Sequence, residues 1–203
     1  MKIKICGLTD PREAEYLNRY HVDYAGMVLF FPKSKRNISL EKAALIRAAL
    51  DPSILSVAVT VSPDQDQIRA ISEAGFDLIQ IHGPLPEGFP SGIRLPVFKA
   101  FNVDDLPLLD RYVCDENITG FVMDAATPGS GKTFDWDLIR GLDLKGRLLI
   151  LAGGLDPSNI IEATAYVRPD VVDVSTGVEY DGRPGKDPEK IRAFVLAARS
   201  FCP

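Results

Sequence analysis

Two side chains that can transfer protons stand at the ends of apolar runs in this 203-residue chain. Cys6 ends the run KIKIC and is followed by Gly7, which leaves room for the thiol. A thiol acts as a base or a nucleophile once nearby cations or helix N-termini lower its pKa, although most buried cysteines are only small hydrophobic residues. Asp124 ends the run ITGFVMD, where a carboxylate is either a catalytic group or a helix cap. Both residues are candidates for acid–base chemistry.

Two glycine-containing turns near the C-terminus are candidates for anion binding. The sequence LLILAGGLDPSNI places Gly153 and Gly154 after an apolar run, and VVDVSTGVE ends the next run with Ser175, Thr176 and Gly177. Backbone without side chains approaches a phosphate closely, and successive N–H groups form an anion-binding concavity. Tight turns alone would also explain these glycines, but two such turns at adjacent units favour a phosphate site.

A basic run and one histidine are candidates for further substrate contacts. Arg36 belongs to PKSKRNIS together with Lys33 and Lys35, on the C-terminal side of a predicted strand. Such a run is usually a solvated loop, yet loops on this side of a strand also carry binding residues. His82, in IQIHGP, either lines a pocket or is a structural histidine with satisfied hydrogen bonds.

The segment GSGKT at 129–133 looks like a nucleotide-binding loop, but its spacing is wrong. The phosphate loop of NTPases has a glycine five places before the glycine of Gly-Lys, and this chain has Ala126 there. We expect instead a mobile loop that covers the site, with glycine hinges on either side of Ser130.

The elements that must position these residues repeat regularly along the chain. Short β-branched runs alternate with stretches of helical periodicity, which indicates right-handed βαβ units and a parallel sheet. The predicted strands are Lys2–Cys6, Asp23–Leu29, Leu55–Val61, Leu78–Ile81, Val97–Phe101, Gly120–Asp124, Leu148–Leu151 and Val171–Val174. The predicted helices are Pro11–Tyr20, Leu40–Leu50, Pro63–Ala74, Val103–Val113, Trp136–Leu142, Pro157–Tyr166 and Pro188–Ser200.

Eight such units in a chain of this length predict a small α/β protein, a single-domain (β/α)8 TIM barrel over residues 1–203 with its active residues at the C-terminal ends of the strands. The fourth crossover, HGPLPEGFPSGIRLP, is rich in Pro and Gly and is predicted to hold at most a turn or two of helix. A doubly wound open sheet is the alternative, but CGLTDPRE follows the first strand where a dinucleotide-binding fold has G-x-G-x-x-G. Several helices are predicted to begin with a capping residue and then proline, at Asp10-Pro11, Ser62-Pro63, Asp156-Pro157 and Asp187-Pro188.

Composition excludes several classes of function. The 23 Lys and Arg against 28 Asp and Glu give a formal net charge of −5, which disfavours nucleic acid or an anionic membrane as the main partner. No apolar run reaches the roughly 18 residues of a membrane span and no signal region follows the first lysines, so we expect a cytoplasmic protein. Three cysteines without a CxxC pair and two histidines, His21 and His82, disfavour a disulfide framework and a metal site.

Six motifs together resemble the phosphoribosylanthranilate isomerase family of tryptophan biosynthesis: KICGLTD, FPKSKRNIS, IQIHG, DAATPGSGKTFDW, LAGGLDPSNI and DVSTGVE…GRPGKDPEKIRAF. The resemblance runs from Lys2 to about Phe194, and KICG and GSGKTFDW in this order are highly specific for the family. It implies a (β/α)8 barrel and an Amadori rearrangement of N-(5′-phosphoribosyl)anthranilate to an open-chain deoxyribulose phosphate, without cofactor or metal.

The resemblance also implies residue roles. Cys6 matches the family's general base and Asp124 its general acid. Arg36 matches the residue that holds the anthranilate carboxylate. The pair Gly153–Gly154 and the turn Ser175–Gly177 match the phosphate cradle.

Two positions depart from the family pattern. The loop after Asp124 lacks the extra residues, often aromatic and glycine, that the family carries between Pro128 and Gly129. Thr60 stands where phenylalanine is more common. The first departure bears on how the site closes, and neither touches the implied acid or base.

Two other functions stay open at this stage. A related phosphate-binding barrel of the indoleglycerol phosphate synthase or tryptophan synthase α type would carry lysine or glutamate at strand ends in place of Cys6 and Asp124. A barrel that only binds a phosphorylated metabolite as a regulator would have no need of either residue. The sequence leaves the choice between monomer and homodimer open.

Overall fold

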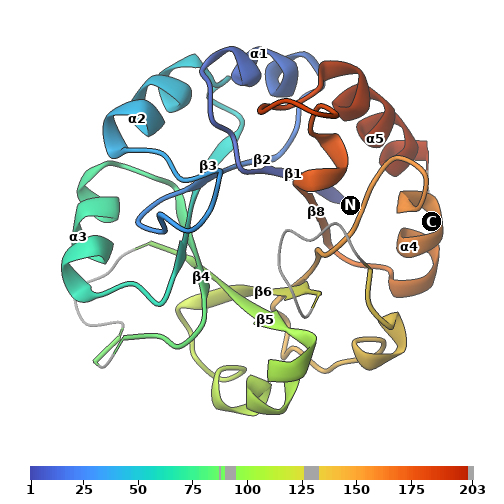
Figure 1. Ribbon diagram of the computed structural model, residues 1–203. Coiled ribbons are helices and arrows are strands. Elements are labelled where there is room, and N and C mark those ends of the chain that lie inside the picture. Colours follow the sequence, from blue (N-terminus) through green and yellow to red (C-terminus); the bar gives the residue numbers. More distant parts are fainter. Residues whose placement is uncertain (87, 90–94, 126–132, 201–203) are drawn as a thin grey trace.

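The computed structural model describes residues 1–86, 88–89, 95–125 and 133–200, and its strands close a parallel barrel in which β8 pairs with β1 (Figure 1). Every predicted strand is confirmed to within two residues at either end. The strands are β1 (Lys2–Cys6), β2 (Tyr24–Val28), β3 (Leu55–Val61), β4 (Leu78–His82), β5 (Val97–Asn102), β6 (Ile118–Asp124), β7 (Leu148–Leu151) and β8 (Val171–Val174).

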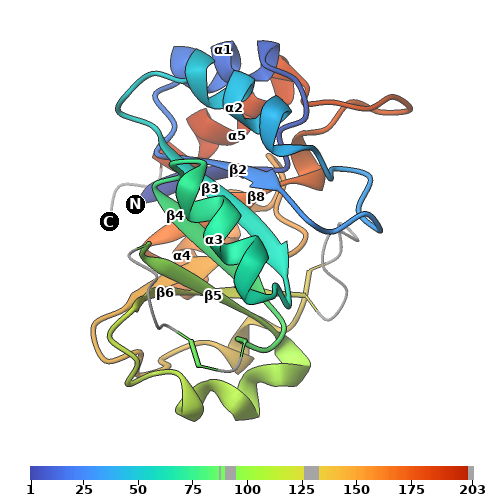
Figure 2. The same cartoon turned by 90° about the vertical axis from the view of Figure 1, so that its left-hand side faces the viewer.

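Helices cover the outside of the barrel, as Figures 1 and 2 show. The α-helices are α1 (Arg12–Arg19), α2 (Leu40–Ala49), α3 (Gln65–Glu73), α4 (Ile160–Val167) and α5 (Pro188–Ser200). Short 3-10 segments are η1 (Val103–Arg111), η2 (Trp136–Leu138) and η3 (Thr176–Val178).

Two predicted helices are wrong in type or length. The segment predicted as a helix over Val103–Val113 forms the 3-10 segment η1, because Pro107 lies inside it and cannot supply an α-helical N–H. The helix predicted over Trp136–Leu142 ends at Leu138, and Gly141 nearby has a positive φ of 78° that a helix does not accept.

Side-chain caps mark the starts of α2, α3 and α5 but not those of α1 and α4. Asp187 accepts a hydrogen bond at 2.9 Å from the backbone N–H two residues on, and α5 begins at Pro188 as predicted. At α3 the prediction is wrong, because Asp64 and not Ser62 is the cap: its side chain accepts from Gln67 N and completes a capping box. The helices α1 and α4 begin one and three residues later than predicted.

Successive side chains along each strand point alternately into the barrel and toward the helices, which gives two apolar clusters. One cluster of buried side chains fills the barrel interior and includes Tyr24, Val57, Phe98 and Val122. The larger cluster lies between the outward faces of the strands and the surrounding helices. Because the strands are parallel, their carboxyl ends and the loops that follow all meet at one mouth of the barrel.

Two crossovers bear on the predictions. Between β4 and β5 the described residues form no helix, and the prediction there was a fourth helix reduced to at most a turn or two. The glycine-hinged loop predicted to cover the site includes residues 126–132, which lie outside the described residues. Within the described part of the chain, no helix is long and apolar enough to cross a membrane.

Candidate active site

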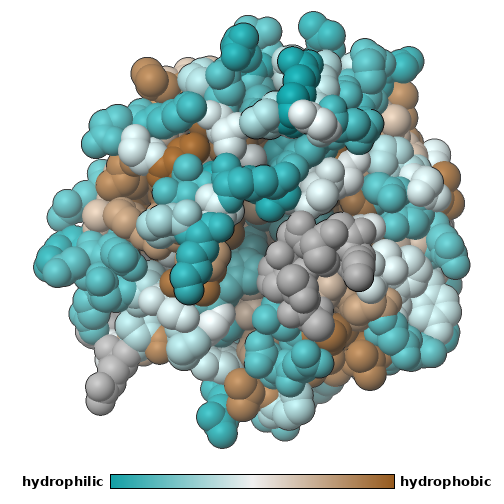
Figure 3. All heavy atoms as spheres, in the orientation of Figure 1, coloured by the Kyte–Doolittle hydropathy of each residue, from teal (hydrophilic) through white to brown (hydrophobic). Residues whose placement is uncertain are grey.

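A cavity of about 470 Å³ opens at the mouth of the barrel. Figure 3 shows this face, hollowed near its centre and bordered by many hydrophilic side chains. All the predicted site residues line the cavity: Cys6, Arg36, His82, Asp124, Gly153, Gly154, Ser175, Thr176 and Gly177. The barrel therefore brings together residues that lie up to 171 positions apart in the chain.

Cys6 ends β1 and is half-buried against its neighbours. Burial raises the pKa of its thiol, while the ammonium groups of Lys4 and Lys186 act in the opposite direction. The following Gly7 has a φ of 78°, and any Cβ there would collide with Arg36 Cδ. Glycine at this position thus lets the chain turn sharply after Cys6 and lets Arg36 pack across it.

Asp124 ends β6 and is almost fully buried. Its Oδ1 accepts a hydrogen bond at 2.8 Å from the backbone N–H of Ala125. Gly153, at a φ of 80°, packs against both groups, since a Cβ there would lie 3.0 Å from Asp124 Oδ1 and 2.6 Å from Ala125 N. Burial is the main cause that raises the pKa of Asp124 to about 6, so its neutral, proton-donating form persists near neutral pH.

Arg36 is fixed by two hydrogen bonds and is not a solvated loop residue. Its Nε pairs with Glu179 Oε1 at 2.5 Å, and its Nη2 donates to Thr176 Oγ1 at 2.8 Å. Neighbouring Lys35 also pairs with Glu179, at 2.7 Å, but its side chain is 70% exposed against 13% for Arg36. Although burial opposes it, the bonds from these cations lower the pKa of Glu179 to about 2, so Glu179 holds Arg36 as a permanent anion.

His82 ends β4 and lies 2.9 Å from Gln80, measured from His82 Nε2 to Gln80 Nε2. Burial, together with the nearby charges of Lys4 and Lys99, lowers the pKa of His82 to about 3. The imidazole is therefore neutral at physiological pH and serves as a hydrogen-bonding group that cannot act as a cationic acid.

The two glycine turns after β7 and β8 lie side by side at the rim of the cavity. Gly153 and Gly154 both have positive φ, and a Cβ on Gly177 would collide with Leu155 O, so this glycine lets the two turns pack together. The backbone N–H groups of Gly154 and Gly177 donate to no described residue. Ser175 Oγ donates to Cys6 O at 2.9 Å and ties this turn to β1.

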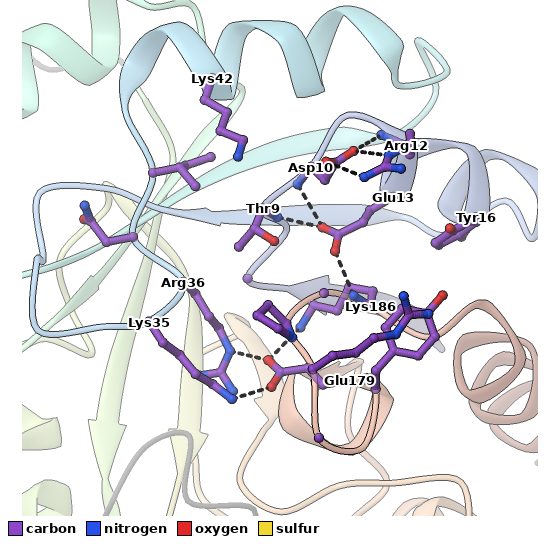
Figure 4. A pocket seen from close by; sticks show the side chains of 18 residues that line it. Thr9, Asp10, Arg12, Glu13, Tyr16, Lys35, Arg36, Lys42, Glu179 and Lys186 are labelled. Carbon is purple, nitrogen blue, oxygen red and sulfur yellow. Dashed lines mark hydrogen bonds and ion pairs between the residues drawn. The ribbon is translucent and has the colours of Figure 1, made fainter.

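A second cavity, of about 790 Å³, also has Arg36 in its wall (Figure 4). Ion-paired and hydrogen-bonded side chains such as Arg12, Glu13 and Lys186 line it, and neither Cys6 nor Asp124 does. The predicted acid and base therefore face the smaller cavity. Among the described residues, no group of three or more His, Cys, Asp or Glu is placed to hold a metal ion.

Several residues that shape this site were not predicted from the sequence. Lys4, Gln80, Asn102 and Asp173 point into the barrel, and the last three line the cavity. The two-residue period of a strand could have found Lys4, Gln80 and Asp173, because each lies two residues before a predicted site residue. Asn102 directly follows the predicted strand Val97–Phe101. Glu179 carried no such signal, since its link to Arg36 joins loops 143 positions apart.

The closed barrel with a cavity at the carboxyl ends of its strands defines the class, a (β/α)8-barrel enzyme. The family model for N-(5′-phosphoribosyl)anthranilate (PRA) isomerase matches residues 3–197. The N-(5′-phosphoribosyl)anthranilate isomerase of Clostridium kluyveri is 40% identical over 99% of both chains. The chain therefore belongs to the N-(5′-phosphoribosyl)anthranilate isomerase family, and it catalyses the isomerase step of tryptophan biosynthesis.

Solved structures agree with this assignment. The phosphoribosylanthranilate isomerase of Thermotoga maritima matches with a TM-score of 0.86 and 35% identity, covering 99% of this chain and all of that one. A phosphoribosylanthranilate isomerase solved in complex with reduced 1-(o-carboxyphenylamino)-1-deoxyribulose 5-phosphate matches with a TM-score of 0.81 and 34% identity over 99% of this chain and 100% of that one.

Proposed function

We propose that the chain converts N-(5′-phosphoribosyl)anthranilate to 1-(2-carboxyphenylamino)-1-deoxyribulose 5-phosphate with Cys6 as general base and Asp124 as general acid. The observation that carries this proposal is their shared cavity: a thiol at the end of β1 and a buried carboxyl group at the end of β6 face one space beside two glycine turns. The structurally similar isomerase that was solved with a reduced product analogue supports the substrate class.

Asp124 starts the reaction. Its carboxyl proton passes to the ring oxygen of the aminofuranose, the C1–O bond breaks, and the nitrogen lone pair forms the C1=N bond of a Schiff base. With a pKa of about 6, roughly a tenth of Asp124 carries a proton at pH 7. A carboxyl group of ordinary pKa would be protonated about a hundredfold less often.

Cys6 completes the rearrangement. The positive C1=N group acidifies the neighbouring C2–H bond, and the Cys6 thiolate takes this proton, leaving an enolamine that tautomerises to the C2 ketone. Because burial raises the thiol pKa, the working pair of thiolate and carboxylic acid is a minor ionisation state of the resting site. General acid and base catalysis each typically contribute about 10²–10⁴-fold, which offsets that low population.

The remaining residues anchor the two ends of the substrate. The N–H groups of Gly154 and Gly177 point to a phosphate cradle, since they have no acceptor among the described residues. Arg36 binds the anthranilate carboxylate through its remaining donors, while Glu179 and Thr176 hold the guanidinium in place. Anchoring at both ends keeps C1 and C2 in register with the acid and the base.

The fluorescence of the anthranilate group tests the proposal. The wild-type protein, added at micromolar concentration to freshly generated substrate, removes the substrate's fluorescence. Cys6→Ala folds normally but loses about two to four orders of magnitude in kcat, whereas the matched variant Cys114→Ala, at an exposed cysteine, stays at the wild-type rate. Cys6→Ala activity within threefold of wild type would remove Cys6 from the mechanism.

A further inference from the structure

A charged lysine lies inside the barrel directly below Cys6. Lys4 precedes Cys6 by two residues in β1, so both side chains point to the barrel axis. The Lys4 side chain is fully buried, and its Nζ pairs with Asp173 Oδ2 at 2.8 Å. Lys4 and Asp173 are direct partners in the register of β1 with β8. An ammonium group at such depth is costly unless it is paired, and this pair meets that requirement.

The thiol of Cys6 meets this ammonium group beside Gly26 of β2. A Cβ on Gly26 would lie 2.9 Å from Cys6 Sγ and 3.2 Å from Lys4 Nζ, so the missing side chain leaves the space that both atoms use. The two atoms are thus within the roughly 6 Å over which an opposite charge shifts a pKa. Lys4 has three N–H donors, and Asp173 takes one of them.

The charges around Cys6 are not equivalent. Lys186 also acts on the thiol, but its Nζ donates to Ser175 O at 3.1 Å and lies 3.4 Å from Glu179, so it is shared with the rim. The negative charge of Asp173 opposes formation of the Cys6 thiolate, but the ion pair with Lys4 offsets that charge. Burial lowers the pKa of Lys4, but the nearby Asp173 and Cys6 outweigh this effect and raise it. Lys4 therefore stays charged over the working pH range.

We propose that Lys4 is a positioning residue that makes the thiolate of Cys6 available to the reaction, and that Asp173 holds the Lys4 ammonium in place. This inference rests on the proposed role of Cys6 as the base, and it adds the group that makes such a base possible in a buried site. Lys4 does not line the cavity, so it acts through Cys6 and not on the substrate.

A second buried lysine provides a matched control. Lys99 of β5 is 3% exposed but points away from the barrel axis, where its Nζ donates to Ala100 O at 2.7 Å and lies 4.4 Å from the centre of the Phe101 ring. Lys99→Met removes a buried ammonium group of the same chemistry without touching the surroundings of Cys6. Any general effect of losing a buried lysine appears in both variants.

The test measures the thiol directly, in the 203-residue chain with Cys6 as its only cysteine (Cys114→Ser with Cys202→Ser). The rate of alkylation by iodoacetamide, followed by intact mass between pH 6 and 11, gives the midpoint of thiolate formation. In this background Lys4→Met is combined with Asp173→Asn, because Lys4→Met alone would leave Asp173 buried without its partner.

We expect the midpoint of this double variant to rise by about half a unit or more, because Lys4 acts on the thiol more strongly than the Asp173 carboxylate that is removed with it. The corresponding drop in kcat at pH 7 is about threefold or more. Lys99→Met shifts the midpoint by less than about 0.3 unit. If the double variant does not fold, Lys4→Gln keeps a hydrogen-bond donor for Asp173 without the charge and gives the same readout. A midpoint unchanged in the folded double variant or in Lys4→Gln overturns the inference.

These outcomes separate this inference from the proposed function. If the alkylation midpoint is unchanged in the Lys4 variants and Cys6→Ala is inactive, Lys4 has no role in forming the thiolate, and Cys6 is still the base. An active Cys6→Ala protein removes the base itself, whatever the alkylation midpoint shows.

Discussion

The two sides of the active cavity surround their reactive groups differently. On the β6 side, Asp124 faces the backbone N–H of Ala125 and the bare Cα of Gly153, and burial raises its pKa to about 6. On the β1 side, Cys6 has the Lys4–Asp173 pair below it and Lys186 at the rim. The groups that contact Asp124 are mostly neutral backbone, and Asp173 and Lys4 act on it only in second place and in opposite directions, whereas Cys6 lies directly beside a cluster of charges.

This difference follows from what burial does to an acid and to a base. Burial favours the neutral form of both side chains. For Asp124 the neutral form is the proton donor, so neutral surroundings suffice. For Cys6 the neutral form is the inactive thiol, so the same burial works against the base and a nearby cation has to oppose it. A site that excludes water can thus prepare its acid by burial alone, but it needs a charged group to prepare its base.

The largest effect is expected on the acid side. Asp124→Asn keeps the shape of the side chain and its backbone contact but cannot donate a carboxyl proton, so we predict a loss of about two to four orders of magnitude in kcat. Asp104→Asn, at an exposed position in η1, is the control and stays at the wild-type rate. Steady-state fluorescence measurements decide the matter, and a fully active Asp124→Asn protein would show that water or another acid opens the ring.

Arg36 is expected to come next. Its planar guanidinium makes charge-assisted hydrogen bonds, and losing the equivalent of one such bond costs about 1.5–3 kcal/mol, so Arg36→Met lowers kcat/KM by about one to two orders of magnitude. Lys35→Met removes a charge that pairs with the same Glu179, and Lys33→Met removes an exposed one. Equal losses in all three variants would replace a specific Arg36 contact by general attraction of an anionic substrate.

The phosphate cradle gives a smaller effect, which is confined to binding. Gly154→Val places a branched side chain at a φ of 66° on the cavity rim, and we predict that KM and the inhibition constant of inorganic phosphate both rise about tenfold. Gly146→Val is the matched control, because Gly146 has a similar φ of 81° and open space around it. Unchanged phosphate inhibition in a folded Gly154→Val protein would place the cradle elsewhere.

The pH dependence of kcat/KM distinguishes the ionisation of Asp124 from that of Cys6. Below pH 6 the thiolate population falls tenfold per unit while Asp124 is already protonated, so kcat/KM rises with pH up to a bend near 6 and is then level. The level part extends upward until the Cys6 thiol titrates, above its ordinary range. The substrate phosphate also titrates near pH 6, so Asp124→Asn serves as the control. A bend that persists in Asp124→Asn belongs to the phosphate and not to Asp124.

Most of this architecture could be predicted from the sequence, because strand runs and glycine turns are local signals, whereas among the predicted cap–proline pairs only Asp187-Pro188 marked a helix start correctly. The strands and the site residues at their ends followed from apolar runs that stop at Cys6 and Asp124. What could not be predicted depends on pairing at a distance: Glu179 fixes Arg36 from a loop at the other end of the chain, and Asp173 neutralises Lys4 across the closure of β1 with β8. The 3-10 conformation of η1 was also missed, although Pro107 was visible as a helix breaker.

Transfer of the C2 proton tests the central claim most directly. With substrate that carries deuterium at C2 of the sugar, we predict that the wild-type protein turns over more slowly than with unlabelled substrate and that the label moves to solvent or to the product through Cys6. Cys6→Ala, at saturating substrate, should leave the deuterium on C2, while Cys114→Ala behaves as wild type. Loss of the deuterium at the wild-type rate in Cys6→Ala would contradict the assignment of Cys6 as the base.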